Sequence, residues 1–231
     1  MASVGMRLEI EGTVTMKVRR QLQWALWTLM GLLVPMPVVY ALEVNLSADL
    51  PYLDIEYEGK RVRIERIQDT EHRLTNSFTK TSRPCPPFCI HPMQATVGVE
   101  TVGELELLDF LIEKVRTDSG LLIDARTPEW YKKGTIPGAV NIPWTLLTVG
   151  PDNPHTARIL EALGAVDRGG EWDFRSALDL MLFCNGPWCD QSPRAIKNLV
   201  SLGYPPEKLS YYRGGMQLWQ LLGLTTVVPR Q

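Results

Sequence analysis

The fold is decided by the stretch Leu180-Met-Leu-Phe-Cys-Asn-Gly-Pro-Trp-Cys-Asp-Gln-Ser-Pro193. Its first four residues form a short apolar run, which is typical of a buried strand. Ser192-Pro193 is typical of a helix start, so we expect the next helix to be capped at Ser192. The seven residues between Cys184 and Ser192 then form a loop from a strand to a helix. Repeated units of this kind predict an α/β domain.

The same alternation extends over residues 99–224. Short apolar runs predict strands at 121–123, 139–142 and 209–212. Helix starts are predicted at Thr127-Pro128, at Asn153-Pro154 and after Gly214-Gly215. Thr101 stands three residues before Glu104, which is the spacing of a capping box. The segment therefore predicts an α/β domain with a mainly parallel sheet.

A different pattern precedes this domain. Leu53, Ile55 and Tyr57 alternate with acidic residues, Gly59 permits a turn, and residues 61–65 alternate again. This pattern is typical of a β-hairpin with one solvent-facing side. Residues 69–92 are mostly polar and end in a proline-rich stretch that contains Cys85-Pro-Pro-Phe-Cys89, so we expect a loop. Residues 42–97 are thus predicted to be an extension of the domain at 98–231.

Residues 1–41 have the pattern of an export signal. Lys17, Arg19 and Arg20 precede an apolar run at 24–34, and cleavage is expected after Ala41. Met16 is then a candidate translation start. The protein is predicted to be periplasmic or secreted. The alternative is a membrane anchor facing the periplasm, because the apolar run at 22–42 is nearly long enough to span a bilayer.

The overall charge excludes one class of function. The chain of 231 residues carries 24 Lys and Arg against 26 Asp and Glu, a formal net charge of −2. A general nucleic-acid binder needs a basic surface, so no nucleic-acid partner is expected. Its four cysteines are too few for a disulfide-dense scaffold, but they fall in two close pairs.

Cys184 has the position expected of a nucleophile. It directly follows an apolar strand, and ligands of parallel α/β sheets bind beyond the carboxyl ends of the strands. Loop N–H groups and the positive end of a following helix both favour thiolate over thiol. The thiolate is the reactive form, so this position suits covalent sulfur chemistry.

Three sets of motifs resemble the rhodanese-like sulfurtransferase family. Leu122-Ile-Asp-Ala-Arg-Thr-Pro-Glu-Trp130 with Gly134-Thr-Ile-Pro-Gly-Ala-Val-Asn-Ile142 resembles its first signature. Phe183-Cys-Asn-Gly186 resembles the catalytic segment, and Leu202-Gly-Tyr204 with Tyr212-Arg-Gly-Gly-Met-Gln-Leu-Trp219 resembles the closing signature. The resemblance extends over residues 98–228 and implies a three-layer domain with a mainly parallel central sheet, here with an N-terminal β-hairpin extension.

The resemblance implies a role for each matching residue. Cys184 corresponds to the cysteine that accepts sulfur as a persulfide, without a cofactor or a metal. The sulfur donor would be a small sulfur compound or a persulfide carrier, and the acceptor a thiol, including a protein thiol, or another nucleophile. The candidate substrate-binding residues are Asn185, Gly186, Pro187, Trp188, Asp190, Gln191, Ser192 and Arg194. The candidate supporting residues are Asp124, Arg126, Arg213, Gly214 and Gly215.

The sequence departs from the family pattern in three respects. Thr135 replaces the usual histidine of the first signature, and the loop after Cys184 is longer than the short rhodanese loop. Residues 185–191 also contain no Lys or Arg, so an anionic donor such as thiosulfate is expected to bind poorly unless Arg194 or Arg213 points inward. A longer loop is also found in cell-cycle phosphatases of this fold, but the position of their phosphate-binding arginine is Asp190 here, which disfavours that activity.

Several hypotheses remain open for the other cysteines. Cys189 either resolves a Cys184 persulfide or sulfenate, forms a static disulfide that closes the site, or accepts sulfur itself. Cys85 and Cys89 form a local structural disulfide, a second dithiol that exchanges with Cys184 and Cys189, or part of a four-cysteine zinc site with His91 as a substitute ligand. The main prediction is a sulfurtransferase. The alternatives are a thiol–disulfide redox protein and an inactive binding module.

Overall fold

The structure is a computed structural model that describes residues 44–148, 150 and 153–230. The chain divides into two units, 1–41 and 42–231, and the folded domain belongs to the second unit. The predicted export signal or anchor lies outside the described residues. Among the residues that are described, no helix is long and apolar enough to cross a membrane.

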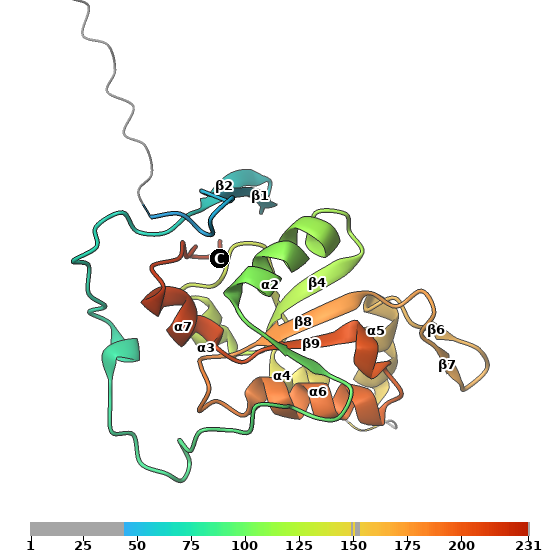
Figure 1. Ribbon diagram of the computed structural model, residues 1–231. Helices are drawn as coiled ribbons and strands as arrows, with labels where there is room; N and C mark the ends of the chain where they lie inside the picture. The colour runs from blue at the N-terminus through green and yellow to red at the C-terminus, as the bar shows by residue number, and fades with distance from the viewer. Residues whose placement is uncertain (1–43, 149, 151–152, 231) are drawn as a thin grey trace, which may run out of the picture. The chain divides into compact units, whose positions relative to one another are not determined.

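The second unit is built around a five-stranded parallel sheet, which confirms the predicted fold class (Figure 1). Two adjacent inner strands, β8 (Asp179–Phe183) and β4 (Gly120–Asp124), are near-continuous apolar runs, as expected for strands covered on both faces. Their register pairs Leu122 with Met181 and Asp124 with Phe183. The strands follow the order β3 (Glu100–Val102), β9 (Leu209–Tyr212), β8 (Asp179–Phe183), β4 (Gly120–Asp124) and β5 (Ala139–Asn141).

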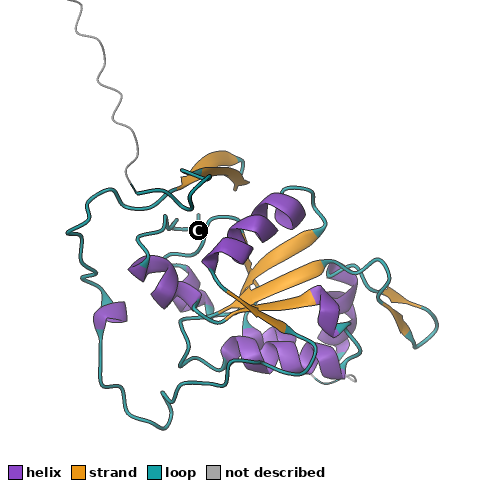
Figure 2. Ribbon diagram, in the orientation of Figure 1, coloured by secondary structure: helices purple, strands orange, loops and turns teal. Residues whose placement is uncertain are grey.

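Alternate side chains of the sheet pack into two separate cores. Leu122, Met181 and Phe183 enter one core, whereas Ile123 and Leu182 enter the other. Helices cover both faces of the sheet and complete the three layers (Figure 2). The first core contains residues of α2 (Glu104–Phe110), the π-helical turn η2 (Leu111–Val115) and α7 (Gly215–Leu221); the second contains residues of α4 (Trp144–Leu147), α5 (Pro154–Ala162) and α6 (Gln191–Ser201).

Two predicted helix starts are displaced. Helix α6 begins at Gln191 with Asp190 as its N-cap, not at Ser192, and the amide of Arg194 donates to the carbonyl of Asp190 (3.0 Å). Pro193 does not prevent this start, because proline is tolerated in the first turn of a helix. The loop after Cys184 is therefore residues 185–190, shorter than predicted.

The capping box before α2 lies two residues later than expected. The Gly103 amide donates to the Glu106 carboxylate (3.0 Å), because Thr101 is paired with Tyr211 in the sheet. The cap is thus set by the end of strand β3, which the sequence pattern did not predict.

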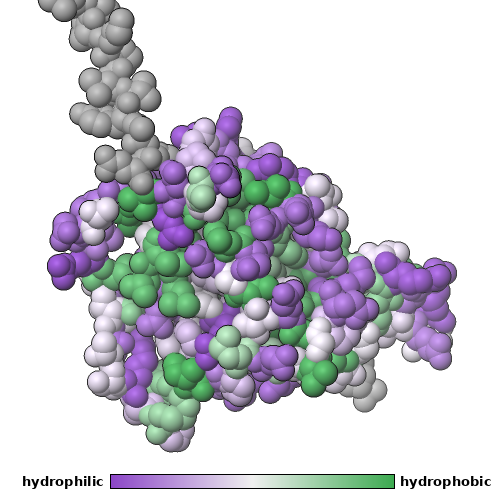
Figure 3. Space-filling model, in the orientation of Figure 1, coloured by the Kyte–Doolittle hydropathy of each residue, from purple (hydrophilic) through white to green (hydrophobic). Residues whose placement is uncertain are grey.

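The remaining elements are short and lie outside the central sheet. They are α3 (Pro128–Tyr131), the 3-10 turns η1 (Ser77–Thr79) and η3 (Pro206–Lys208), and an antiparallel ribbon of β6 (Val166–Asp167) and β7 (Trp172–Asp173). The turn of the ribbon exposes Arg168 and Glu171, and hydrophilic residues dominate its surface in Figure 3. The ribbon is therefore a solvated projection of the domain.

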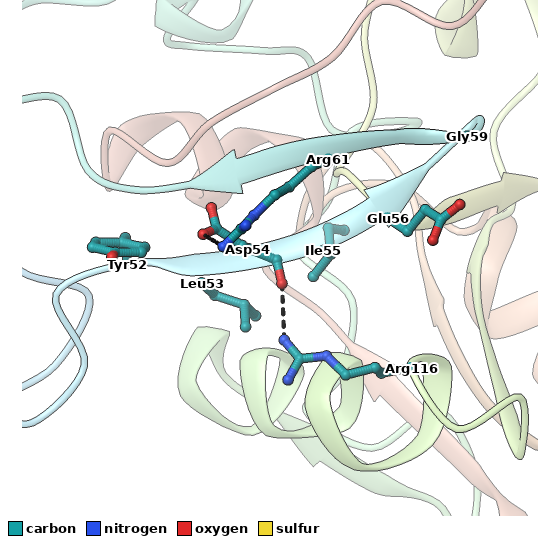
Figure 4. A pocket seen from close by; sticks show the side chains of 8 residues that line it. All are labelled: Tyr52, Leu53, Asp54, Ile55, Glu56, Gly59, Arg61 and Arg116. Carbon is teal, nitrogen blue, oxygen red and sulfur yellow. Dashed lines mark hydrogen bonds and ion pairs between the residues drawn. The ribbon is translucent and has the colours of Figure 1, made fainter.

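The predicted hairpin is present and packs on the domain. Its strands β1 (Leu53–Tyr57) and β2 (Lys60–Ile64) are antiparallel, and Leu53, Ile55 and Ile64 are buried in the core that contains α2. Arg116, just after η2, donates to the backbone carbonyl of Asp54 (2.8 Å; Figure 4). An open cavity of about 750 Å³ lies on the hairpin and is lined by no cysteine; its lining residues are Tyr52, Leu53, Asp54, Ile55, Glu56, Gly59, Arg61 and Arg116.

The hairpin is expected to contribute to the stability of the whole unit. Replacing Ile64, which is fully buried, by alanine should lower the free energy of unfolding by about 2–5 kcal/mol. Arg61→Ala on the same strand is the matched control; its side chain is 78% exposed, so the loss should stay below about 1 kcal/mol. Urea denaturation measures both. Equal effects of the two substitutions would show that the hairpin is not part of the cooperative unit.

Candidate active site

Cys184 lies at the carboxyl end of the central strand β8. The preceding carbonyl, that of Phe183, accepts a hydrogen bond from the amide of Ala125 (3.0 Å), which fixes the strand end beside the end of β4. Residues 185–190 then turn back to α6, with the Cys189 amide donating to the Gly186 carbonyl (2.9 Å). Cys184 is only 2% exposed. The cysteine is therefore enclosed by its own loop.

The start of α7 packs backbone to backbone against this loop. The amides of Met216 and Gln217 donate to the carbonyls of Cys184 (3.0 Å) and Asn185 (2.9 Å). Gly215 has a left-handed backbone (φ 55°), and a Cβ atom there would lie 2.8 Å from the amide nitrogen of Gly186 and closer still to the carbonyl oxygen of Cys184. Only glycine fits this approach. This contact explains Gly215, which the sequence placed among the supporting residues.

Asp124 and Arg126 form a buried ion pair behind the loop. Nη2 of Arg126 lies 2.6 Å from the Asp124 carboxylate and also donates to the carbonyl of Gly134 (2.6 Å). Its Nη1 reaches Oδ1 of Asn185 (3.5 Å). Thr135, which replaces the usual histidine, donates its hydroxyl to Asp124 (2.8 Å). These side chains join three segments and leave neither charge unpaired in the interior.

The structure pairs all four cysteines. Cys184 is bonded to Cys189, with Cα atoms 6.3 Å apart, and Cys85 is bonded to Cys89. The sulfur of Cys184 also lies 3.4 Å from the carbonyl oxygen of Cys189. A disulfide sulfur is not a thiolate. In this oxidised state Cys184 is therefore not a nucleophile, and the four cysteines do not form the zinc site of the alternative hypothesis. No group of three or more His, Cys, Asp or Glu side chains in the described residues is arranged to hold a metal ion.

Residues 83–93 of the extension, here called the strap, lie against the cysteine loop. The amide of His91 donates to the carbonyl of Pro187 (2.9 Å), and the His91 carbonyl accepts from Nη2 of Arg213 (2.7 Å). The ring of Phe88 meets the indole of Trp188 edge-on, with centroids 5.5 Å apart. Trp188 is further fixed because its Nε1 donates to Gln217 on α7 (2.7 Å). The strap therefore contacts two consecutive residues of the loop.

The two arginines that the sequence suggested as anion-binding groups, Arg194 and Arg213, are bonded to other residues. Arg194 is paired with Asp190 (2.6 Å), its side chain is 58% exposed, and its guanidinium also lies 5.5 Å from the ring of Trp144. Arg213 is bonded to the strap instead. Arg83 of the strap supplies a third cation, with its guanidinium 4.3 Å from the ring of Trp188.

Arg83 and Arg213 share an unusual feature. In the described part of the chain neither forms an ion pair, and the Nε atom of each is buried without a hydrogen-bond partner. Arg83 was not predicted from the sequence, because it lies far from the loop in the chain, in a segment without periodicity. The adjacent Cys85-Cys89 pair was the one nearby signal.

The first turn of α6 contains two further polar groups without partners. Oε1 of Gln191 and Oγ of Ser192 are buried and make no hydrogen bond to the described residues. Ser192 itself is fully buried. Both were predicted to bind substrate, and both lie directly after the loop that contains the cysteines.

Two tyrosines of β9 precede Arg213 and stay protonated. Burial raises the pKa of Tyr211 to about 12 and raises the pKa of Tyr212 further. Their hydroxyl groups have no hydrogen-bond partner within the described residues. Neither phenol is therefore a source of negative charge or a base near neutral pH.

Gly215 is expected to be indispensable for the loop. Gly215→Ala should lower stability by about 1–2 kcal/mol from its left-handed backbone alone, and by more from the clash with Cys184 and Gly186. Gly150→Ala is the control, because Gly150 is exposed and a Cβ atom added there would meet no described atom within 4 Å. Urea denaturation compares them, and equal stability of the two variants would contradict the close approach.

Comparison with known proteins agrees with this architecture. A sequence model of the family described as "Rhodanese-like domain" matches residues 106–222, half of the chain. The HTH-type transcriptional regulator Rv0324 of Mycobacterium tuberculosis is 32% identical over 103 residues, which cover 45% of this chain and 35% of the regulator. The chain thus matches about a third of the length of this relative.

Solved structures include two sulfurtransferases that resemble the chain. Human single-domain sulfurtransferase TSTD1 is 26% identical and covers 53% of this chain and 96% of its own, with a TM-score of 0.38. Thiosulfate sulfurtransferase from Pseudomonas aeruginosa is 19% identical and covers 58% of this chain and 21% of its own, with a TM-score of 0.39. From the family match over residues 106–222, the chain belongs to the rhodanese-like domain family.

Proposed function

We propose that the protein is a sulfurtransferase that carries sulfane sulfur as a persulfide on Cys184. The observation that carries the proposal is the place of Cys184, buried at the carboxyl end of a central strand and enclosed by a loop that ends on α6. The loop leads directly into the N-terminus of α6, and helix N-termini favour bound anions. The proposed location is the periplasm or the exterior, where paired cysteines persist.

The reaction begins from the reduced pair. The Cys184 thiolate attacks the outer sulfur of a persulfide or thiosulfate, the donor leaves as a thiolate or as sulfite, and a Cys184 persulfide forms. A thiolate acceptor then attacks the outer sulfur and regenerates the Cys184 thiolate. The disulfide of Cys184 and Cys189 is the oxidised form of this pair, and a reductant must open it before Cys184 can attack a donor.

Several hydrogen-bond donors in and next to the cysteine loop have no partner among the described residues. The backbone N–H groups of Gly186, Trp188 and Asp190 donate no hydrogen bond to the described residues. The hydroxyl of Ser192 is likewise unpartnered and buried. Donors that are already oriented stabilise an anion better than donors that must first reorganise. These groups support a persulfide anion as the species that the loop binds.

A second candidate function is thiol–disulfide exchange through Cys184 and Cys189. The bond between these two cysteines favours it, because the same pair would be the oxidised form of a redox protein. The two functions differ in what Cys189 does. Exchange requires both sulfurs in every turnover, whereas sulfur transfer to an external thiol requires Cys184 alone.

Sulfur loading distinguishes the two functions. The full-length protein is reduced, treated with a sulfane-sulfur donor and digested for mass spectrometry of its cysteine peptides. One added sulfur on the Cys184 peptide is expected, retained in Cys189→Ser and absent in Cys184→Ser. A Cys184–Cys189 disulfide without bound sulfur, together with full loss of turnover in Cys189→Ser, would replace the proposal by the redox function.

Arg83 is expected to determine how well a dianionic donor binds. With thiosulfate as donor, Arg83→Gln should raise the KM about tenfold, because an uncompensated cation beside the loop is removed. Arg194→Gln is the matched control; its charge is already neutralised by Asp190, so its KM should change less than about twofold. Initial rates at constant ionic strength give both values. An equal change in the two variants would place the donor away from the strap.

A further inference from the structure

We propose that the Cys85–Cys89 disulfide is the entry point through which a dithiol protein reduces the buried Cys184–Cys189 disulfide. The strap would then be an internal redox relay and not only a cover. The inference rests on the proposed function in one respect, because Cys184 must return to the thiolate before it accepts sulfur again. The proposed reductant is a protein with a thioredoxin-type pair of vicinal thiols.

The two disulfides differ sharply in access. Cys184 is 2% exposed and Cys189 is 6% exposed, whereas Cys85 is exposed and Cys89 is half-buried. Thiol–disulfide exchange requires an attacking sulfur to make contact with a disulfide sulfur. A folded protein reductant meets the outer pair and not the inner pair. If the outer pair passes electrons to the inner pair, the reductant does not need to reach the buried sulfurs of Cys184 and Cys189.

The strap brings the two pairs into neighbouring positions. Phe88, next to Cys89 in the chain, contacts Trp188, next to Cys189, at a centroid distance of 5.5 Å. Two residues beyond Cys89, the amide of His91 donates to the carbonyl of Pro187 (2.9 Å). One ring of this contact is thus next in the chain to a cysteine of the outer pair, and the other ring is next to a cysteine of the inner pair. No other described segment of the extension contains a cysteine.

The strap is also suited to move. Within residues 83–93 the structure has no helix or strand. The strap is held to the domain by the two backbone hydrogen bonds of His91, by one from the Thr101 hydroxyl to the Met93 carbonyl, and by ring contacts. Segments with few backbone hydrogen bonds open at low free-energy cost. Reduction of Cys85 and Cys89 removes the covalent link within the strap, which frees it to bring Cys89 against Cys189.

Arg83 places a positive charge beside the two rings that neighbour Cys89 and Cys189 in the chain. Its guanidinium lies 4.3 Å from the ring of Trp188 and 5.5 Å from the ring of Phe88. A nearby cation favours the thiolate, which is the attacking form in exchange. The charge therefore assists the Cys89 thiolate and the thiolate that leaves from the inner pair.

The exchange balances without a further reactant. The external dithiol reduces Cys85–Cys89 to two thiols and becomes a disulfide itself. The Cys89 thiolate attacks the Sγ of Cys189, the inner disulfide breaks, and Cys184 leaves as a thiolate. The Cys85 thiolate then attacks Cys89, restoring the outer disulfide and releasing Cys189 as a thiolate. Two electrons and two protons pass from the external dithiol to the inner pair.

The first test compares reductants on the oxidised full-length protein. Thioredoxin, with its NADPH-dependent reductase, should reduce both pairs, as measured by NADPH consumption and by alkylation of the Cys184 peptide. In the double variant Cys85→Ser with Cys89→Ser, thioredoxin should reduce the inner pair at least about tenfold more slowly. The small reductant tris(2-carboxyethyl)phosphine should act equally on both proteins. Equal rates with thioredoxin would overturn the relay.

A second test asks whether the two sulfurs can meet. The variant Cys85→Ser with Cys184→Ser leaves Cys89 and Cys189, which should form an intramolecular disulfide on mild oxidation, detected in non-reduced peptides. Absence of this bond in a folded protein would also overturn the relay. Sulfur loading of the phosphine-reduced Cys85→Ser, Cys89→Ser protein keeps the proposals separate. If the double variant is loaded with sulfur, the sulfurtransferase proposal is supported, whether or not the relay operates. If the relay operates but no sulfur is loaded, only the sulfurtransferase proposal is rejected.

Discussion

The buried ion pair of Asp124 and Arg126 determines which segments must meet behind the cysteine. Moving two charges out of water is costly, and the pair is tolerated because every strong polar group on it is bonded. Asp124 ends strand β4, and Arg126 reaches both the turn at Gly134 and the side chain of Asn185. A shift of the Gly134 turn or of the Asn185 loop would leave a buried guanidinium N–H without its acceptor. The end of β4 and the beginning of the cysteine loop are therefore held in one arrangement.

Strand β8 could be predicted because its signal, a run of apolar residues, lies within a short stretch of sequence. Leu180–Phe183 is apolar throughout, and a parallel strand covered on both faces needs no other signal. The start of α6 was predicted less accurately. Ser192-Pro193 has the composition of a helix cap, but the same two residues are also tolerated within the first turn of a helix, where the structure places them. Strand β3 at 100–102 was missed because its three residues depend on pairing with β9.

The site itself was only partly predictable. The position of Cys184 followed from one strand and one loop, and the motif at Gly214-Gly215 identified the segment that packs on it. Arg83 and His91 contact the loop from about a hundred residues away in the chain, and no periodicity connects them to it. Arg194 forms an ion pair with Asp190, four residues before it on the same helix face. This ion pair neutralises the charge of Arg194. Such contacts arise from the tertiary fold.

The strap is attached to the domain largely through its main chain. His91 uses its backbone amide toward Pro187 and its backbone carbonyl toward Arg213, so these bonds do not depend on the histidine side chain. The side chain at position 91 can therefore be exchanged during evolution while the path of the strap over the loop is retained. A rhodanese-like domain with such an attachment can acquire new partner preferences from an appended segment, and the catalytic loop need not change its own sequence.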